Sequence, residues 1–171
     1  GYWGHRNLFG HAETLRIEGS VGRIGEADEF GKLNYNAAIL FEKPGVIGPD
    51  SKFFANVRTV FEHPDAYDRF STKASAGVSY QFTRTQSASA ELSLDYSDID
   101  DVFNPDGVRH LIASIPLQYV FDNRDNRLDP KKGFRVLAFA EPAYDILTGA
   151  AFVKFKGDAS TYRALDDAGK F

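Results

Sequence analysis

The chain of 171 residues contains no cysteine, and this absence removes several classes of protein at once. Without cysteine there is no disulfide framework, no thiolate metal site and no cysteine nucleophile. Methionine is absent too, even at position 1, and the opening residues Gly1-Tyr2-Trp3 carry neither the basic nor the apolar segment of a targeting signal. We therefore expect an internal segment of a longer precursor.

A basic tract and a long apolar run are also missing. The 20 Lys and Arg residues are outnumbered by 24 Asp and Glu, so a nucleic-acid partner is not expected. No stretch approaches the length of about 18 apolar residues that a transmembrane helix needs. Membrane-spanning β-strands are still possible, because each needs only about ten residues that alternate between apolar and polar. The length favours one domain, and we predict a single segment over residues 1–171.

Signatures of catalysis or metal binding are sparse. The four histidines stand apart, and the chain has no HExxH, GxSxG or phosphate-binding glycine loop. Acidic residues gather before Gly107, but their spacing misses the calcium-loop pattern, which favours a solvated loop over a binding site; they are Asp98, Asp100, Asp101, Asn104 and Asp106. We predict no enzyme, no catalytic residue, no cofactor and no metal centre.

The dominant pattern is strict alternation of apolar and polar residues, which is typical of β-strands rather than helices. It predicts eight strands, at 13–24, 32–42, 53–62, 73–82, 89–96, 111–121, 134–144 and 151–162. At about 3.3 Å per residue, strands of this length span roughly 33 to 40 Å, longer than most soluble strands. Tilted by about 45°, they would cover the apolar thickness of a bilayer.

The two faces of these strands differ in a way that favours a membrane barrel. The polar positions are rich in small uncharged residues such as Ser75, Ser79, Ser89 and Ser93, where soluble sheets usually carry Lys and Glu. We predict that the apolar positions face lipid; they are Leu15, Ile17, Ile39, Phe41, Val57, Val78, Tyr80, Leu92, Leu94, Ile115, Leu117 and Tyr119. The alternative is a soluble β-barrel or sandwich that encloses an apolar ligand.

The strand ends and connections support two different aqueous sides. Aromatic residues collect toward strand ends, as girdles at two membrane interfaces would require. The connections 26–31, 63–69 and 98–109 are acidic, whereas 43–51, 84–87 and 123–133 are rich in Pro, Gly or basic residues. Charged residues on the polar face, among them Arg16, Glu18 and Arg58, could form either a hydrated path or a salt-bridge ladder, and the ladder is favoured.

The most charged stretch, FDNRDNRLDPKKGFRV at 121–136, could be a catalytic cluster or a turn. It lacks a histidine and a nucleophile, which argues against catalysis. Asp129, Pro130 and Gly133 are turn-forming residues, because Asp bonds nearby backbone, Pro presets φ and Gly adopts positive φ. Asp122, Arg124 and Asp125 would pin the approach to that turn. We predict a structural role for this stretch.

Two motifs resemble the bacterial surface-antigen barrels of the BamA and TamA type. Asn7-Leu8-Phe9-Gly10-His11-Ala12-Glu13-Thr14-Leu15 resembles that family's early turn N-L-F/L-G-x-G-x-x-L, with Ala12 where the family often has Gly. The stretch Tyr119 to Gly133 resembles its turn Y-D-x-R-D-x-x-L-D-P-x-x-G. The family's V/I-R-G-F/Y loop motif is not present in these residues.

The resemblance implies about half of a sixteen-stranded, antiparallel up-and-down barrel in the bacterial outer membrane. POTRA domains and the closing strands would lie outside this N-terminal half. It implies insertion, assembly or translocation of outer-membrane proteins, with the bilayer and unfolded client proteins as partners and further partners through the missing domains. Alternatives are a passive pore or surface antigen and the soluble barrel above. The two open sheet edges predict closure or edge-to-edge association.

Overall fold

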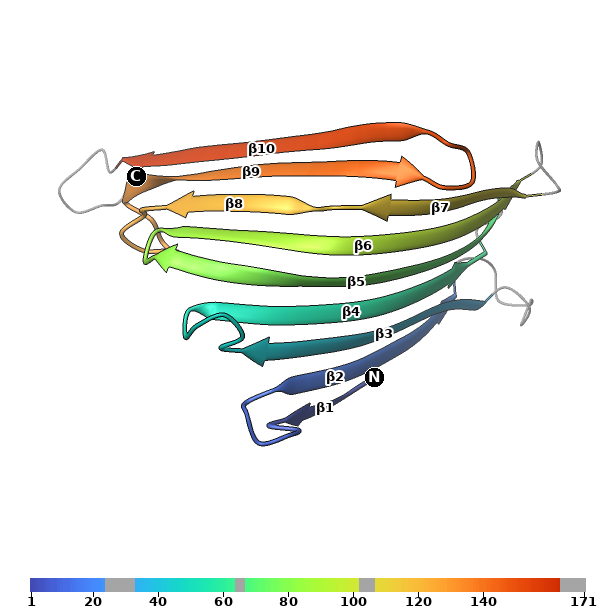
Figure 1. The fold of residues 1–171 in the computed structure, drawn as a ribbon, viewed down its shortest axis with the longest axis horizontal. Helices are drawn as coiled ribbons and strands as arrows, with labels where there is room; N and C mark the ends of the chain where they lie inside the picture. The colour runs from blue at the N-terminus through green and yellow to red at the C-terminus, as the bar shows by residue number, and fades with distance from the viewer. Residues whose placement is uncertain (24–32, 64–66, 102–106, 164–171) are drawn as a thin grey trace.

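The computed structural model describes residues 1–23, 33–63, 67–101 and 107–163, and shows one antiparallel β-sheet (Figure 1). Alternating apolar and polar residues form every long strand. The strands are β1 (Tyr2–Arg6), β2 (Thr14–Arg23), β3 (Leu33–Pro44), β4 (Ser51–Glu62), β5 (Tyr67–Thr83), β6 (Gln86–Asp101), β7 (Val108–Ser114), β8 (Leu117–Asp122), β9 (Lys132–Asp145) and β10 (Ala151–Arg163). None of the described residues forms a helix long and apolar enough to span a membrane.

Each strand pairs with the next along the chain, so the sheet is an up-and-down meander. The exception is β7 and β8, which lie end to end between β6 and β9 in one continuous register. Pro116 separates them, and Pro142 on β9 lies opposite Ile115. Glu91 N donates to Pro116 O and Ile115 N donates to Pro142 O, both at 3.0 Å, but neither proline has an N–H to return the bond. The predicted strand 111–121 is therefore one wall strand with a proline break.

All eight predicted strands are present, with two differences. β1 was not predicted, because its five residues are too few to show an alternation. The acidic connections were drawn too long: β5 already begins at Tyr67, and β6 continues to Asp101. The strand pairing of Asp68 with Asp100 extends the ladder into that acidic sequence. The rest of the connections 26–31, 63–69 and 98–109, with Asn104 and Asp106, lies largely outside the described residues.

The hairpins give the sheet two distinct ends, which Figure 1 shows at left and right. We call the left one the turn end; it holds residues 7–13, 45–50, 84–85 and 123–131. The opposite end, called the loop end, holds the hairpin 146–150 and the strand ends next to the acidic connections. The turn end is oblique, since successive turns from β1 to β9 lie progressively farther out (Figure 1).

Within the described residues the sheet is a single layer, bounded by β1 and β10, so it does not close on itself there. Of the two predicted outcomes for the edges, closure is not seen in this part of the chain, and edge-to-edge association stays a prediction. Burial is inverted relative to a soluble protein. The only hydrophobic residues described as buried are Ala38 and Ala143, whereas the buried polar set is larger: Glu13, Ser51, Ser75, Ser93, Ser114, Glu141 and Asp145.

Candidate functional site: two faces and two turns

The apolar positions of all the strands lie on one side of the sheet, which we call the apolar face. Cross-strand Cα partners form rungs that can be followed from strand to strand. One central rung joins Ile17, Ile39, Val57, Ala74, Leu94, Ala113 and Tyr144. Ile39, Val57 and Leu94 are each more than 40% exposed, and Leu92 on the next rung is 67% exposed. No second layer of the described chain covers this face.

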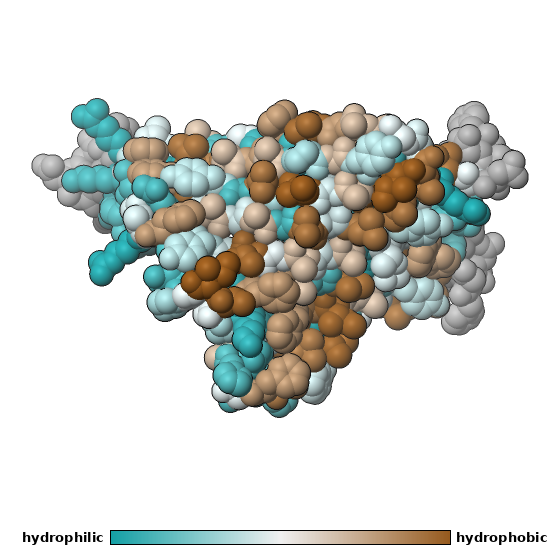
Figure 2. All heavy atoms as spheres, viewed as in Figure 1, coloured by the Kyte–Doolittle hydropathy of each residue, from teal (hydrophilic) through white to brown (hydrophobic). Residues whose placement is uncertain are grey.

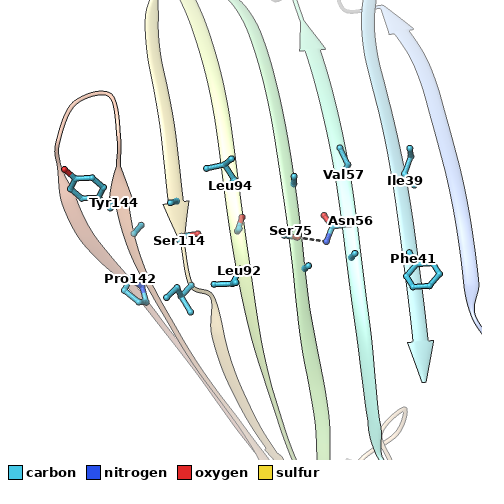
Figure 3. A pocket seen from close by; sticks show the side chains of 17 residues that line it. Ile39, Phe41, Asn56, Val57, Ser75, Leu92, Leu94, Ser114, Pro142 and Tyr144 are labelled. Carbon is cyan, nitrogen blue, oxygen red and sulfur yellow. Dashed lines mark hydrogen bonds between the residues drawn. The ribbon is translucent and has the colours of Figure 1, made fainter. Parts of the chain in front are cut away.

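The middle of the apolar face carries an open hollow of about 880 Å³ (Figure 3). Its lining includes the large residues Ile39, Phe41, Leu92, Leu94 and Tyr144, together with small alanines on the strands between them. The lining is mainly apolar, with Asn56, Ser75, Ser93 and Ser114 as its polar members, and it offers no cluster of catalytic groups. In the described ranges no three His, Asp or Glu side chains lie close enough together to hold a metal ion.

Two rows of aromatic side chains border the apolar face. In the loop-end row the rings follow one another across four strands, with centroids 6.2 to 6.4 Å apart; its members are Tyr35, Phe61, Phe70 and Tyr96. In the turn-end row Phe41 meets Phe53 at 6.3 Å, and Phe121 stacks on Phe134 at 5.0 Å. Tyr80 and Tyr119, which share a rung through Ala88, lie between these two pairs. Aliphatic residues and alanines dominate between the two rows.

The opposite side, called the polar face, is packed closely by small residues and ordered by polar contacts. Asn56 Nδ2 donates to Ser75 Oγ at 2.7 Å (Figure 3), and Ser114 Oγ donates to Glu141 at 2.9 Å. Gly77 is a close-contact position, because an added Cβ would lie 2.5 Å from Ala90 O and 2.7 Å from the Phe54 ring. These short distances reserve the site for glycine.

Charges on the polar face are paired both along one strand and across strands. Glu18 on β2 lies 3.0 Å from Arg16 and 3.5 Å from Arg58 on β4. Lys52 and Glu42 form a further pair at 2.7 Å between β4 and β3. This arrangement fits the predicted salt-bridge ladder, in which cross-strand pairs of opposite charge stabilise neighbouring strands.

The first motif, Asn7 to Glu13, forms the turn between β1 and β2. Asn7 Oδ1 accepts a hydrogen bond from Ala12 N at 2.9 Å, and the Glu13 carboxylate accepts from Phe9 N and His11 N. Glu13 is 1% exposed. Burial raises the pKa of Glu13, but these N–H donors and the Lys43 charge outweigh that effect and lower the pKa below its usual value.

Ala12 adds strain to this turn. Its φ is 62°, in the left-handed region where an L-residue costs roughly 1–2 kcal/mol. Asn7 and Gly10 also have positive φ, but Asn tolerates this conformation and Gly adopts it freely. The departure from Gly at position 12 therefore has a structural cost that the sequence comparison did not reveal. Leu8 and Gly10 lie at the turn surface, as does Phe9, whose ring is exposed.

The second motif forms the connection from β8 to β9. Asp122 binds Arg124 through two hydrogen bonds, of 2.8 and 2.7 Å. Asp125 Oδ1 accepts from the backbone N–H groups of Asn126, Lys131 and Lys132 at 2.9 to 3.1 Å. The N–H groups of Lys132 and Lys131 lower the pKa of Asp125 because they favour its ionised form. The segment is a turn stabilised by its own carboxylates.

The details of this turn differ from the sequence expectation. Asp125 and Asn126, rather than Asp129, accept the backbone hydrogen bonds, and Pro130 lies between them and β9. Gly133 has φ 105°, and an added Cβ would lie 2.6 Å from Asn123 O. The two motifs do not meet in one site, since they lie at the same turn end but in hairpins that several strands separate. The sequence pattern did not predict that Glu13 is buried and accepts the hydrogen bonds of its turn. The position of a carboxylate just before a strand could have indicated this role.

The sheet has one layer, with large apolar residues exposed on one face and small polar residues packed closely on the other. This is the arrangement of a wall segment of a transmembrane β-barrel. The chain matches the family model described as the Omp85 superfamily domain over residues 7–171, and it belongs to that superfamily. The family consists of transmembrane β-barrels of the bacterial outer membrane. They act in the assembly or translocation of outer-membrane proteins as non-enzymatic factors. No curated protein and no solved structure matches the chain.

Family membership settles one alternative left open by the residues. A soluble barrel would turn the apolar side chains inward, whereas this chain belongs to a family of membrane-spanning barrels and exposes them. The predicted resemblance to surface-antigen barrels is therefore confirmed at the level of the family. The choice between an assembly factor and a passive pore is a separate question.

Proposed function

We propose that the full-length protein assembles or translocates other outer-membrane proteins in the manner of the BamA and TamA type, and that residues 1–171 form part of its barrel wall. In this proposal the apolar face contacts lipid and the polar face lines the aqueous interior. The observation that supports this proposal most strongly is the pattern of burial. Leu92 is exposed among apolar neighbours, whereas Ser75, Ser93 and Ser114 are buried on the other face.

The slope of the aromatic rows supports a membrane position. Phe41 on β3 shares a rung with Pro142 on β9, and Phe134 lies eight residues, or four rungs, beyond Pro142 toward the turn end. This shift is about 26 Å along the strands over about 24 Å of sheet width. The turn-end row therefore crosses the rungs at about 45°.

The loop-end row leans in the same direction. Tyr35 shares a rung with Asp98, and Tyr96, the last ring of the row, lies two residues, or one rung, closer to the turn end. This shift of about 7 Å over about 14 Å of sheet width gives an angle of about 25°. Strands of membrane barrels tilt by about 35–45°, so a membrane plane must cross their rungs obliquely. Two rows of rings that both slope this way support their assignment as interface girdles.

The proposed mechanism needs no bond chemistry in this segment. Assembly would use a weakly paired strand seam that templates a client strand, together with local thinning of the bilayer. The seam would be formed by strands other than those described. The described residues would instead support the barrel structurally. The turns around Glu13 and Asp125 would hold the hairpins at the periplasmic end, and the apolar face would anchor the wall.

Client assembly distinguishes this proposal from a passive pore. The full-length protein is reconstituted into vesicles, and the folding rate of an added, urea-unfolded outer-membrane barrel is compared with that in empty vesicles and in vesicles holding an unrelated barrel of similar size. Faster client folding supports the proposal. An unchanged folding rate together with a steady ion conductance in planar bilayers overturns it and supports the pore.

A further inference from the structure

The charges just outside the two aromatic rows of the apolar face have opposite signs. One rung beyond Phe41 lies Lys43, and one rung beyond Phe134 lies Lys132, whose partner on β10 is Arg163. Arg84 follows Phe82 in the intervening turn. We call Lys43, Arg84, Lys132 and Arg163 the cationic row. Toward the loop end the same face carries the acids Asp68, Asp98 and Asp100, of which Asp98, on the rung of Phe70, pairs with Arg109 at 3.0 Å.

Three acids of the turn end, Glu13, Asp122 and Asp125, are engaged in holding the turns. Asp125 accepts three backbone N–H groups, and Asp122 binds Arg124 in a two-pronged contact. Glu13 caps its turn and reaches Lys43 only at 3.7 Å. Within the described residues no carboxylate lies within salt-bridge distance of Lys132. Lys132 is therefore available to an outside anion, and long hydrophilic side chains project from the turn end in Figure 2.

Lys132 and Arg163 are the strongest part of this row, because they are direct cross-strand partners. Two like charges directly opposite each other on a sheet are destabilising, and an anion placed between them relieves the repulsion. A guanidinium can hold a phosphate through two hydrogen bonds, and a lysine adds a compact charge. The Asp125 carboxylate accepts a hydrogen bond from the backbone N–H of Lys132. The backbone at Lys132 is therefore held in place, and the Lys132 side chain extends from a fixed Cα position.

We propose that the cationic row, centred on Lys132 and Arg163, binds the phosphate groups of anionic phospholipids in the leaflet at the turn end. The position fits, since the two side chains stand one rung outside the aromatic ring of Phe134, where headgroups begin above an interface girdle. Negative lipid surfaces attract Lys and Arg close to them. This inference rests on the proposed lipid contact of the apolar face, and it adds the chemistry of the lipid.

The test measures which lipids accompany the full-length protein in vesicles of phosphatidylcholine. Spin-labelled phosphatidylglycerol and spin-labelled phosphatidylcholine are added in turn, and the immobilised fraction of each gives a relative association constant. We expect phosphatidylglycerol to be preferred, and the preference to fall as salt increases. The double variant Lys132→Gln/Arg163→Gln should lose about fivefold in this preference for each charge removed.

A matched variant controls for total charge. Lys52→Gln/Lys156→Gln removes the same charge from the polar face and should keep the preference. Equal loss in both variants, or no preference in the unaltered protein, overturns the proposal. Unfolding midpoints of the two variants show that both barrels are intact. Labels on the apolar face that contact acyl chains without any headgroup preference would leave the lipid contact standing and refute the phosphate site alone.

Discussion

The wall of the sheet and its turn end are stabilised in opposite ways. On the apolar face the large side chains find few partners within the described chain, and Leu92 is two-thirds exposed. At the turn end Glu13 and Asp125 bind backbone N–H groups within their own hairpins. The stability of the wall therefore depends on the medium around it, whereas that of the turns is carried by the chain itself. Substitutions in the two regions should respond differently to the bilayer.

The largest effect is expected from a charge in the centre of the wall. Leu92→Arg should lower the free energy of unfolding in bilayers by about 2–4 kcal/mol, because it places a cation near the midplane. Denaturant unfolding of the full-length barrel in vesicles measures this change. Ser89→Arg, on the polar face of the same strand, should cost much less; similar losses for the two variants would contradict the assignment of the faces.

A second substitution tests the packing of the polar face, where the medium should matter little. Gly77→Ala should cost about 1–3 kcal/mol, because its Cβ would press on Ala90 O and on the Phe54 ring. Gly19→Ala is the matched control, since its nearest new neighbour is Asn36 O at 3.7 Å, an ordinary contact. The same unfolding assay in two lipid compositions should give the same difference. A neutral Gly77→Ala would show that the two strands are less close than described.

The turn before β2 offers a stabilising substitution. Ala12→Gly should raise the free energy of unfolding by about 1 kcal/mol, because it relieves the left-handed strain at φ 62° and this gain exceeds the added chain entropy. Ala55→Gly in the middle of β4 should have the opposite sign, since a strand interior loses stability with glycine. A decrease in stability for both variants would rule out strain at Ala12.

The smallest effect concerns pH at the β8–β9 turn. The N–H groups of Lys132 and Lys131 lower the pKa of Asp125, so its ionised form stabilises the fold above the unfolded pKa. That contribution is lost as the pH falls through the lowered folded-state pKa. Asp125→Asn should therefore flatten the acid side of the stability profile, measured by unfolding between neutral and strongly acidic pH. An unchanged profile for Asp125→Asn would refute its role.

Much of the wall could be predicted from the sequence, because alternation with a period of two can be recognised within one strand. Pairing with neighbouring strands keeps the apolar side chains of each strand on the same face. Ile39, Val57 and Leu94 lie on one rung as parity requires. β1 could not be predicted, since five residues show no clear period. The position of Pro142 opposite Ile115, next to the break at Pro116, is set by the pairing of two strands and is a nonlocal feature.

The turns were located correctly by composition, but their hydrogen bonds were not. Asp125, rather than Asp129, reaches the backbone of Lys131 and Lys132, and this choice depends on how the chain folds back over six residues. The burial of Glu13 depends in the same way on the closure of residues 7–13 around it. Turn residues reveal where a chain reverses, whereas the acceptors that stabilise the reversal are set by three-dimensional geometry.

The most direct test of this account is a cysteine scan along β6 of the full-length protein, which the absence of cysteine in residues 1–171 makes simple here. Single cysteines at positions 87 to 94 are labelled with a fluorophore and quenched by lipids brominated on their acyl chains. Strong quenching should alternate with a period of two, at Ala88, Ala90, Leu92 and Leu94 but not at Ser87, Ser89, Glu91 or Ser93. Uniform quenching, or quenching of the serine positions, would contradict the assignment of the apolar face to lipid.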